Sequence, residues 1–188
     1  MGSFHYRILV VDDDEQLRRM LERMLSNAGY EVRTAKDGFD ALAQMRHGVP
    51  ELMITDLNMP NMSGFELLSV VRRRFPQIEV VVITEQFVGS SHPEGLLADA
   101  IFDKGQFSPP QLLDTVRNLL AQSPVRASHA RPDKAPVWIP RNGEYYVVTC
   151  TECLRSFSLP LDEPSDVPRE ATCVHGGSQV RFILEPKG

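Results

Sequence analysis

Five polar residues follow or end short apolar runs in this chain, and their types together suit phosphoryl transfer. Asp12, Asp13 and Asp56 are carboxylates, which repel one another when clustered unless a hard divalent cation such as Mg²⁺ neutralises them. Thr84 and Lys104 add a hydroxyl and a cation, the groups that complete a phosphate pocket. In such a site the Asp56 carboxylate would be the nucleophile and would form an acyl phosphate.

The apolar runs that carry these residues are predicted to be strands of one parallel sheet. Strands alternate with segments of helical spacing, which is the pattern of an α/β doubly wound fold. The carboxyl ends of parallel strands form a single edge, where loops on a rigid scaffold collect ligands. The predicted strands comprise residues 6–11, 30–35, 53–55, 78–83 and 100–103, and the predicted helices lie within residues 17–28, 38–45, 65–74 and 108–120.

These motifs resemble the receiver domain of bacterial two-component response regulators over roughly residues 5 to 122. The likeness rests on their order along the chain. An acidic pair follows the first strand, the string Asp-Leu-Asn-Met-Pro-Asn-Met-Ser-Gly begins at Asp56, a threonine ends strand four and a lysine follows strand five. The resemblance implies a flavodoxin-like, five-stranded parallel sheet with the strand order 2-1-3-4-5. That order follows from the family and not from residue spacing.

The resemblance also implies roles for individual residues. Asp56 would be the phosphoacceptor, and Thr84 and Lys104 would contact the phosphoryl group. The implied Mg²⁺ site consists of Asp12, which assists through water, Asp13, Asp56 and the backbone carbonyl of Asn58. The chain would not be an enzyme beyond autocatalysed transfer to its own Asp56. Its upstream partner would be a sensor histidine kinase or a phosphotransfer protein, and the receiver could also mediate dimerisation.

Three positions near this edge depart from the family pattern. Glu85 follows Thr84, where the family usually has a very small residue that leaves the acceptor open. Gly105 replaces the proline that usually follows the lysine, so Lys104 is expected to lie on a freer loop. Ile101 stands where the family has an aromatic residue, and residues 85–99 are expected to form a loop and about two helical turns. A phosphorylation-independent pseudo-receiver scaffold is therefore an alternative.

Composition bounds the class of protein. With 188 residues, 42% of them hydrophobic and 24% charged, the chain can form one ordinary domain and a small second unit. It has no apolar run near the ~20 residues needed to span a bilayer and no hydrophobic signal region, so a cytoplasmic location is expected. The net charge of -5 gives no bulk attraction to nucleic acid. The segment from Val125 onward is balanced, with eight basic and eight acidic side chains.

The chain is predicted to comprise a receiver domain over residues 1–122, a linker over 123–136 and a small β-rich domain over 137–188. The linker is assigned by its polar, proline-punctuated composition. The last unit opens with the apolar residues 137–139, and residues 144–149, 155–159 and 179–184 are then predicted to be short strands. About 50 residues rarely build a sufficient core, so a metal or docking onto a larger domain is expected to stabilise them.

All three cysteines of the chain fall in this unit and resemble a zinc ribbon. Cys150 and Cys153 form a Cys-x-x-Cys turn, and Cys173 and His175 precede the last strand. Together they supply the four nitrogen and sulfur ligands of a structural Zn²⁺ site. Gly176 stands where a regular ribbon has its fourth cysteine. A zinc-free degenerate ribbon and a redox-active Cys-x-x-Cys are the alternatives.

The unit shows neither the two-helix pattern of a helix-turn-helix output domain nor a catalytic constellation. Protein interaction is therefore the favoured output. A zinc-ribbon nucleic-acid binder is an alternative, and it requires several basic residues to meet on one face. These residues are Arg141, Arg155, Arg169, Arg181 and Lys187.

Overall fold

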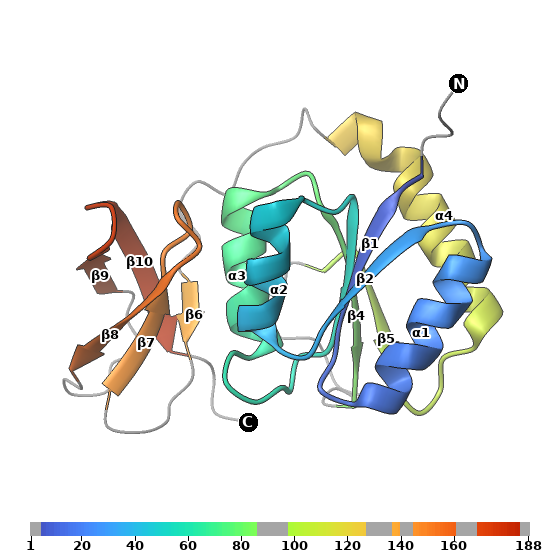
Figure 1. Cartoon of the computed structure of the whole chain (residues 1–188), viewed down its shortest axis with the longest axis horizontal. Helices are drawn as coiled ribbons and strands as arrows, with labels where there is room; N and C mark the ends of the chain where they lie inside the picture. Colours follow the sequence, from blue (N-terminus) through green and yellow to red (C-terminus); the bar gives the residue numbers. More distant parts are fainter. Residues whose placement is uncertain (1–4, 86–97, 127–136, 140–144, 161–168, 185–188) are drawn as a thin grey trace.

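The computed structural model describes residues 5–85, 98–126, 137–139, 145–160 and 169–184. The first part of the chain forms a five-stranded sheet with helices on both faces (Figure 1). Neighbouring strands are parallel and lie in the order β2-β1-β3-β4-β5, which confirms the predicted flavodoxin-like fold. The strands are β1 (Arg7–Val11), β2 (Glu31–Ala35), β3 (Leu52–Thr55), β4 (Glu79–Thr84) and β5 (Ala100–Asp103), and the helices are α1 (Glu15–Asn27), α2 (Gly38–His47), α3 (Gly64–Arg74) and α4 (Pro109–Arg126).

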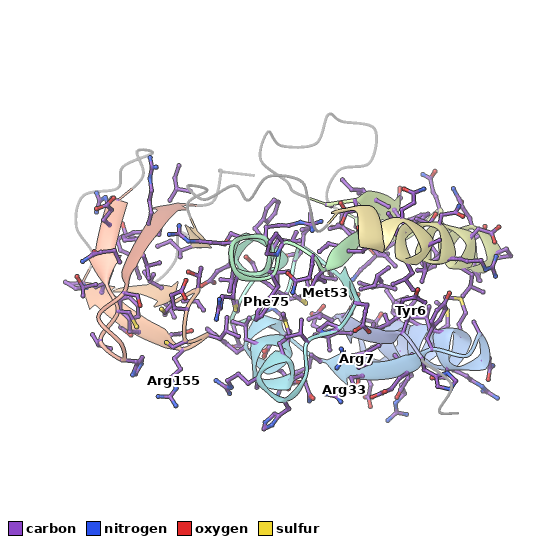
Figure 2. The ribbon with its side chains drawn as sticks, turned by 90° about the horizontal axis from the view of Figure 1, so that it is seen from above. Tyr6, Arg7, Arg33, Met53, Phe75 and Arg155 are labelled. Carbon is purple, nitrogen blue, oxygen red and sulfur yellow. The ribbon has the colours of Figure 1, made fainter. Side chains whose placement is uncertain are left out.

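Two apolar layers hold the helices to the sheet. Because successive strand residues point to opposite faces, Ile8 and Val10 of β1 pack toward α1 and α4, whereas Leu9 and Val11 pack toward α2 and α3. Met53 of β3 lies in the second layer, between the sheet and α3 (Figure 2). The central strands β3 and β4 are buried along their whole length. The carboxyl edge of the sheet therefore rests on a rigid base.

The helices next to that edge begin at side chains that cap them. Asp14 accepts hydrogen bonds from the backbone N–H groups of Gln16 and Leu17 at the start of α1. Ser63 accepts one from the N–H of Glu66 at the start of α3. Such caps satisfy backbone donors that have no partner inside the helix. They fix where each helix leaves the acidic edge.

The last part of the chain contains two small sheets. In the first sheet, β10 lies between β6, which is parallel to it, and β9, which is antiparallel. The second sheet is the antiparallel pair of β7 and β8. The strands are β6 (Val137–Ile139), β7 (Tyr145–Thr149), β8 (Ser156–Pro160), β9 (Arg169–Thr172) and β10 (Gln179–Leu184).

This β-rich unit lies beside α3, on the side of that helix that faces away from the sheet (Figure 1). Ile139, Tyr146 and Val148 belong to the same buried apolar cluster as Phe65 and Val70 of α3. Eight of the eleven residues of α3 are buried, which is far more than a helix covered on one face would bury. The unit is thus docked on the larger domain, one of the two means of stabilisation expected for its size.

The structure departs from the sequence-based expectation at two elements. Helix α4 continues to Arg126, past the domain boundary predicted at residue 122, since extending an existing helix costs little compared with starting one. Strand β9 was missed, because Arg169–Thr172 lacks apolar alternation and is a strand through its pairing with β10. The rest of the predicted linker and most of residues 85–99, where a loop and about two helical turns were expected, lie outside the described residues.

Candidate phosphoacceptor site and cysteine cluster

Three carboxylates meet at the carboxyl edge of the large sheet. Asp12 follows β1 and Asp56 follows β3, and these two strands are neighbours. One carboxylate oxygen of Asp12, one of Asp13 and one of Asp56 all lie within 4.8 Å of one another. Asp12 and Asp56 are buried, whereas Asp13 is exposed. The structure therefore brings together the three carboxylates that the sequence predicts to cluster.

Lys104 reaches both buried carboxylates. Its Nζ lies 2.7 Å from Oδ2 of Asp56 and 3.0 Å from Oδ2 of Asp12. The expectation of a freer Lys104 loop is wrong, because Asp103 fixes the turn: its Oδ1 accepts from the Gly105 N–H at 2.7 Å, and its carbonyl oxygen accepts from the N–H of Phe107. This Asx-type turn takes the place of the usual proline.

Burial and ion pairing oppose each other at two of these groups, and the pKa of each group is raised overall. Burial raises the pKa of Asp12 above its ordinary value, although the Asp14 N–H and the Lys104 ammonium oppose that shift. Burial lowers the pKa of Lys104, but its contacts with Asp56 and Asp12 outweigh burial and raise it overall. Lys104 therefore stays charged between the two carboxylates, and the charged form of Asp12 is held at a cost.

The remaining predicted residues lie around this edge. Thr84 is buried at the end of β4, and its carbonyl oxygen accepts from the Lys104 N–H at 3.1 Å. Glu85 is exposed directly after it, and Asn58 is exposed two residues beyond Asp56. Ile101 of β5 packs partly buried against the apolar layer that faces α2 and α3. The roles of Asp56, Thr84, Lys104 and Asn58 with a phosphoryl group or metal stay predictions.

A short loop ties Asp56 to the start of α3. Oδ1 of Asp56 accepts from the Leu57 N–H at 2.6 Å, and the Leu57 carbonyl accepts from the Gly64 N–H at 2.9 Å. A Cβ at Gly64 would lie 1.9 Å from the backbone oxygen of Asp56, so the close approach requires glycine. A movement of the Asp56 backbone would therefore displace Gly64, the first residue of α3.

The fold and this site define a response regulator receiver domain. Residues 8–101, half of the chain, match the response regulator receiver domain family, and the chain belongs to that family. Response regulator MprA of Mycobacterium sp. (strain KMS) is 34% identical over 131 residues, which are 69% of this chain and 54% of that protein. NtrC, a DNA-binding transcriptional regulator of Salmonella typhimurium, is 36% identical over 77 residues, or 41% of this chain and 16% of that protein.

Solved structures are similar over the same part. A putative response regulator from Chloroflexus aurantiacus superimposes with a TM-score of 0.57 at 32% identity and covers 63% of this chain and 99% of that chain. TrrA of Thermotoga maritima, solved in complex with Mg²⁺ and BeF, gives a TM-score of 0.56 at 32% identity over 61% of this chain and 98% of that one. The chain spans about half the length of MprA and less of NtrC.

A second cluster of chemically capable groups lies in the β-rich unit. The sulfur atoms of Cys150, Cys153 and Cys173 all lie within 4.8 Å of one another, and none is in a disulfide. Burial raises the pKa of the Cys150 thiol to about 11. Burial also opposes ionisation of Cys173, but hydrogen bonding from the His175 N–H and the two other thiols outweighs it, so the pKa of Cys173 is lowered.

The fourth predicted zinc ligand is not in this cluster. Nε2 of His175 lies 3.3 Å from the carbonyl oxygen of Ser156, and among the described residues no fourth His, Cys, Asp or Glu side chain joins the three thiols. Only the backbone N–H of His175 points to the site, at 3.4 Å from Sγ of Cys173. The structure thus brings together three of the four predicted ligands, and their role with a metal stays a prediction.

The contact between the two units includes a buried polar pair that the sequence did not reveal. Oγ1 of Thr149, the residue before Cys150, lies 3.2 Å from Oε1 of Glu66 in the first turn of α3. A glutamate in the first turn of a helix is ordinarily a solvated group that suits the helix dipole, so its type gave no signal of burial. At the rim, Arg74 and Glu152 are 3.9 Å apart, and both are exposed.

The basic residues named for a nucleic-acid surface do not share one face. Arg169 pairs with Phe182 and Arg181 pairs with Glu170 across β9 and β10, so the two arginines point to opposite sides of that sheet. Arg155 is exposed in the turn after β7 (Figure 2). Arg141 and Lys187 lie outside the described residues. The convergence that this alternative requires is absent from the part of the unit that the structure describes.

In the parts of the chain that the structure describes, no helix is both long enough and apolar enough to cross a membrane.

Proposed function

We propose that this protein is a phosphorylation-controlled response regulator that accepts a phosphoryl group on Asp56. The observation that carries the proposal is the position of Lys104, whose ammonium contacts Asp56 at 2.7 Å and Asp12 at 3.0 Å. A cation at this point can meet the charge on an incoming phosphoryl oxygen, which is the main requirement of phosphoryl transfer. Thr84, at the end of the neighbouring strand, is the proposed hydroxyl contact.

The bonds that form and break in the proposed reaction belong to the donor and the Asp56 carboxylate. One carboxylate oxygen attacks the donor phosphorus, and the bond from phosphorus to the donor breaks, with its electron pair leaving on the donor. A P–N bond breaks in a phosphohistidine and a P–O bond in a small acyl phosphate. The product is an aspartyl phosphate. The proposed donors are a sensor histidine kinase or a phosphotransfer protein, and no other enzymatic activity is proposed.

The acidic edge suits Mg²⁺ by its donor set. Asp12, Asp13 and Asp56 offer three carboxylate oxygens, the hard ligands that Mg²⁺ prefers, and the exposure of Asp13 leaves room for water and phosphate oxygens. We propose that Asp13 and Asp56 hold the ion with the Asn58 carbonyl, and that Asp12 acts through water. The ion would neutralise charge on the transferring group. Lys104 and the Leu57 N–H orient Asp56.

We propose that the output is protein interaction and that α3 carries the signal to it. The loop between Asp56 and Gly64 is short and tightly packed, and Glu66, two residues later, contacts Thr149 in the β-rich unit. A shift at Asp56 would reach the docked unit through one helix start. Such relay needs two arrangements of this contact whose populations phosphorylation changes.

For the β-rich unit we propose a bound Zn²⁺ on Cys150, Cys153 and Cys173. The support is the donor set: three sulfur ligands at the ends of two hairpins suit this borderline-soft ion. Such an ion would connect two separate sheets: the β7–β8 pair and the sheet that contains β9 and β10. His175 was the expected fourth ligand, and it would have to leave its contact with Ser156 to serve.

Phosphorylation is tested by incubating the full chain with Mg²⁺ and acetyl phosphate and measuring its intact mass. We expect a mass increase of one phosphoryl group, which is absent in Asp56→Asn and without Mg²⁺. Lys104→Ala should keep the fold but reduce the modified fraction. If the wild type gains no mass with acetyl phosphate or with a cognate kinase, the phosphorylation-independent scaffold is the better description.

A further inference from the structure

The two hairpin connections in the β-rich unit have the same backbone design. Residues 150–155 join β7 to β8, and residues 173–178 join β9 to β10. In each, the N–H of the first residue donates to the carbonyl of the last, at 2.9 Å in one and 2.8 Å in the other. In each, the N–H of the fifth residue donates to the carbonyl of the first, and that fifth residue has a positive φ: Leu154 at 55° and Gly177 at 71°.

This match places each residue of one turn on a residue of the other. Cys150 corresponds to Cys173, and Cys153 corresponds to Gly176. His175 corresponds to Glu152, one position before the ligand position. A histidine at that position leaves the turn in the wrong direction for the cluster, which agrees with the contact of its Nε2 with Ser156 at 3.3 Å.

The distance between two of the thiols fits a tetrahedral metal site, in which three sulfur ligands leave one position over. Sγ of Cys153 and Sγ of Cys173 are 3.8 Å apart. With metal–sulfur bonds of about 2.3 Å, two sulfurs on one tetrahedral zinc lie about 3.8 Å apart. A disulfide would need about 2.05 Å, so the two sulfurs are not bonded to each other, and their separation is one that a shared ion can bridge.

The side of the cluster where the fourth ligand would stand is open to water. Residues 174–177 are exposed, and Val174 is 72% exposed. A Cβ built on Gly176 meets no atom within 4 Å. The fourth position therefore faces solvent and not a packed interior.

We propose that Cys150, Cys153 and Cys173 form a three-thiolate zinc site whose fourth position, beside Gly176, is open and takes its ligand from outside the unit. In the isolated protein that ligand is water. A neutral nitrogen or sulfur donor, such as an imidazole or thiol of a partner molecule, displaces it. Metal sites that keep one position for water or another exchangeable ligand differ in this from closed structural sites.

The inference rests on the zinc proposal above, and Co²⁺ substitution can test the two separately. Reduced full-length protein is loaded with Co²⁺, whose visible bands report its ligands, and titrated with free imidazole. Three variants accompany the wild type. Gly176→Cys supplies the missing thiolate, Gly176→Ala fills the same backbone position without a ligand, and His175→Ala removes the histidine.

With excess Mg²⁺ present to occupy the acidic edge, we expect one Co²⁺ per chain in all four proteins. Imidazole should shift the visible bands of the wild type, Gly176→Ala and His175→Ala, and this shift should be lost in Gly176→Cys. Gly176→Cys should also hold Zn²⁺ more tightly against a chelator.

Three results would overturn these ideas: the first concerns only the open position, and the other two concern the zinc proposal itself. If the wild type does not respond to imidazole while His175→Ala changes the starting spectrum and gains a response, His175 closes the site and the open position is wrong, although zinc stays. If reduced wild type and Gly176→Ala bind neither Co²⁺ nor Zn²⁺, the zinc proposal itself fails. A Cys153–Cys173 disulfide as the stable form under the same reducing conditions would have the second meaning.

Discussion

Oγ1 of Thr149 donates a hydrogen bond of 3.2 Å to Oε1 of Glu66, and both side chains are buried between the two units. The pair joins α3, the helix that follows the loop after Asp56, to the residue that precedes Cys150, the first cysteine of the cysteine cluster. A second hydrogen bond, of 2.9 Å between the hydroxyls of Thr149 and Ser156, closes the β7–β8 pair at the same point. One side chain thus serves the interface and the hairpin.

The first prediction concerns this hydroxyl. Thr149→Val keeps the shape of the side chain but removes the donor to a buried carboxylate, so it should lower the free energy of unfolding by about 1–3 kcal/mol. Urea denaturation of the full chain measures the change. Thr115→Val is the control, because the Thr115 hydroxyl bonds Gln111 on the exposed face of α4 and its loss should cost no more than about 0.5 kcal/mol. Equal effects would show that the buried contact contributes little.

The second prediction concerns the close contact between Gly64, the first residue of α3, and the backbone of Asp56 and Leu57. Gly64→Ala would put a Cβ 1.9 Å from the Asp56 backbone oxygen and 2.7 Å from Cα of Leu57, so the backbone must shift. We expect the free energy of unfolding to fall by about 1–3 kcal/mol or more, and the phosphorylated fraction with acetyl phosphate to be lower. Gly176→Ala, whose Cβ meets nothing within 4 Å, should be neutral in both assays. A Gly64→Ala protein with wild-type stability would contradict the packing described above.

The receiver fold could be predicted because its signals are local. Apolar strands, helical spacing and polar residues at strand ends alternate in order, and these patterns placed Asp12, Asp56 and Lys104 on one edge. A freer loop was expected at Lys104 because a glycine follows the lysine. The position of Lys104 depends instead on the Asx-type turn of Asp103. An aspartate two positions before a glycine is a usable signal for such a turn.

The relations between the two units could not be read from the sequence. Glu66 and Thr149 are 83 positions apart, and neither residue type is unusual for the first turn of a helix or for a strand. The spacing of the cysteines already showed that Gly176 stands where a regular ribbon has its fourth cysteine. The offset of His175 became clear only when the hydrogen bonds of the two turns could be compared. Contacts that depend on docking or on matched backbone geometry have no local sequence signature.

The third prediction concerns a buried ion pair at the far end of α3. The guanidinium of Arg72 contacts the Asp99 carboxylate and donates to the Ile78 carbonyl at 2.6 Å, and Asp99 also accepts from the Val80 N–H at 2.7 Å. Asp99→Ala leaves a buried cation without its carboxylate, so the free energy of unfolding should fall by about 3–5 kcal/mol.

The matched control is the exposed pair of Asp114 and Arg117 on α4, 2.7 Å apart with both side chains about two-thirds exposed. Asp114→Ala should change stability by no more than about 1 kcal/mol, because water screens such pairs. Comparable losses in Asp99→Ala and Asp114→Ala, measured by urea denaturation in the same buffer, would argue against a structural role for the buried pair.

The fourth prediction concerns the buried charge of Asp12 and its dependence on pH. Because burial raises the pKa of Asp12 in the folded protein, the folded state binds a proton more readily than the unfolded state does. The contribution of Asp12 to the free energy of unfolding therefore falls as pH rises from the ordinary carboxyl pKa through the raised one. Above the raised pKa, the buried Asp12 carboxylate is charged and its full destabilising effect is present. Without Mg²⁺, Asp12→Asn should be more stable than wild type at neutral pH, and the difference should shrink as the pH is lowered.

Mg²⁺ should reverse this order, because an ion at the acidic edge compensates the charges that Asp12 and its neighbours bring together. At a Mg²⁺ concentration of 100 times its Kd, the folded wild type gains about 2.7 kcal/mol, and Asp12→Asn, with one carboxylate fewer, should gain less. Thermal denaturation with and without Mg²⁺ at two pH values measures both effects. Asp114→Asn on exposed α4 serves as the control and should respond to Mg²⁺ as the wild type does. If Mg²⁺ stabilised Asp12→Asn as much as the wild type, Asp12 would have no part in the metal site.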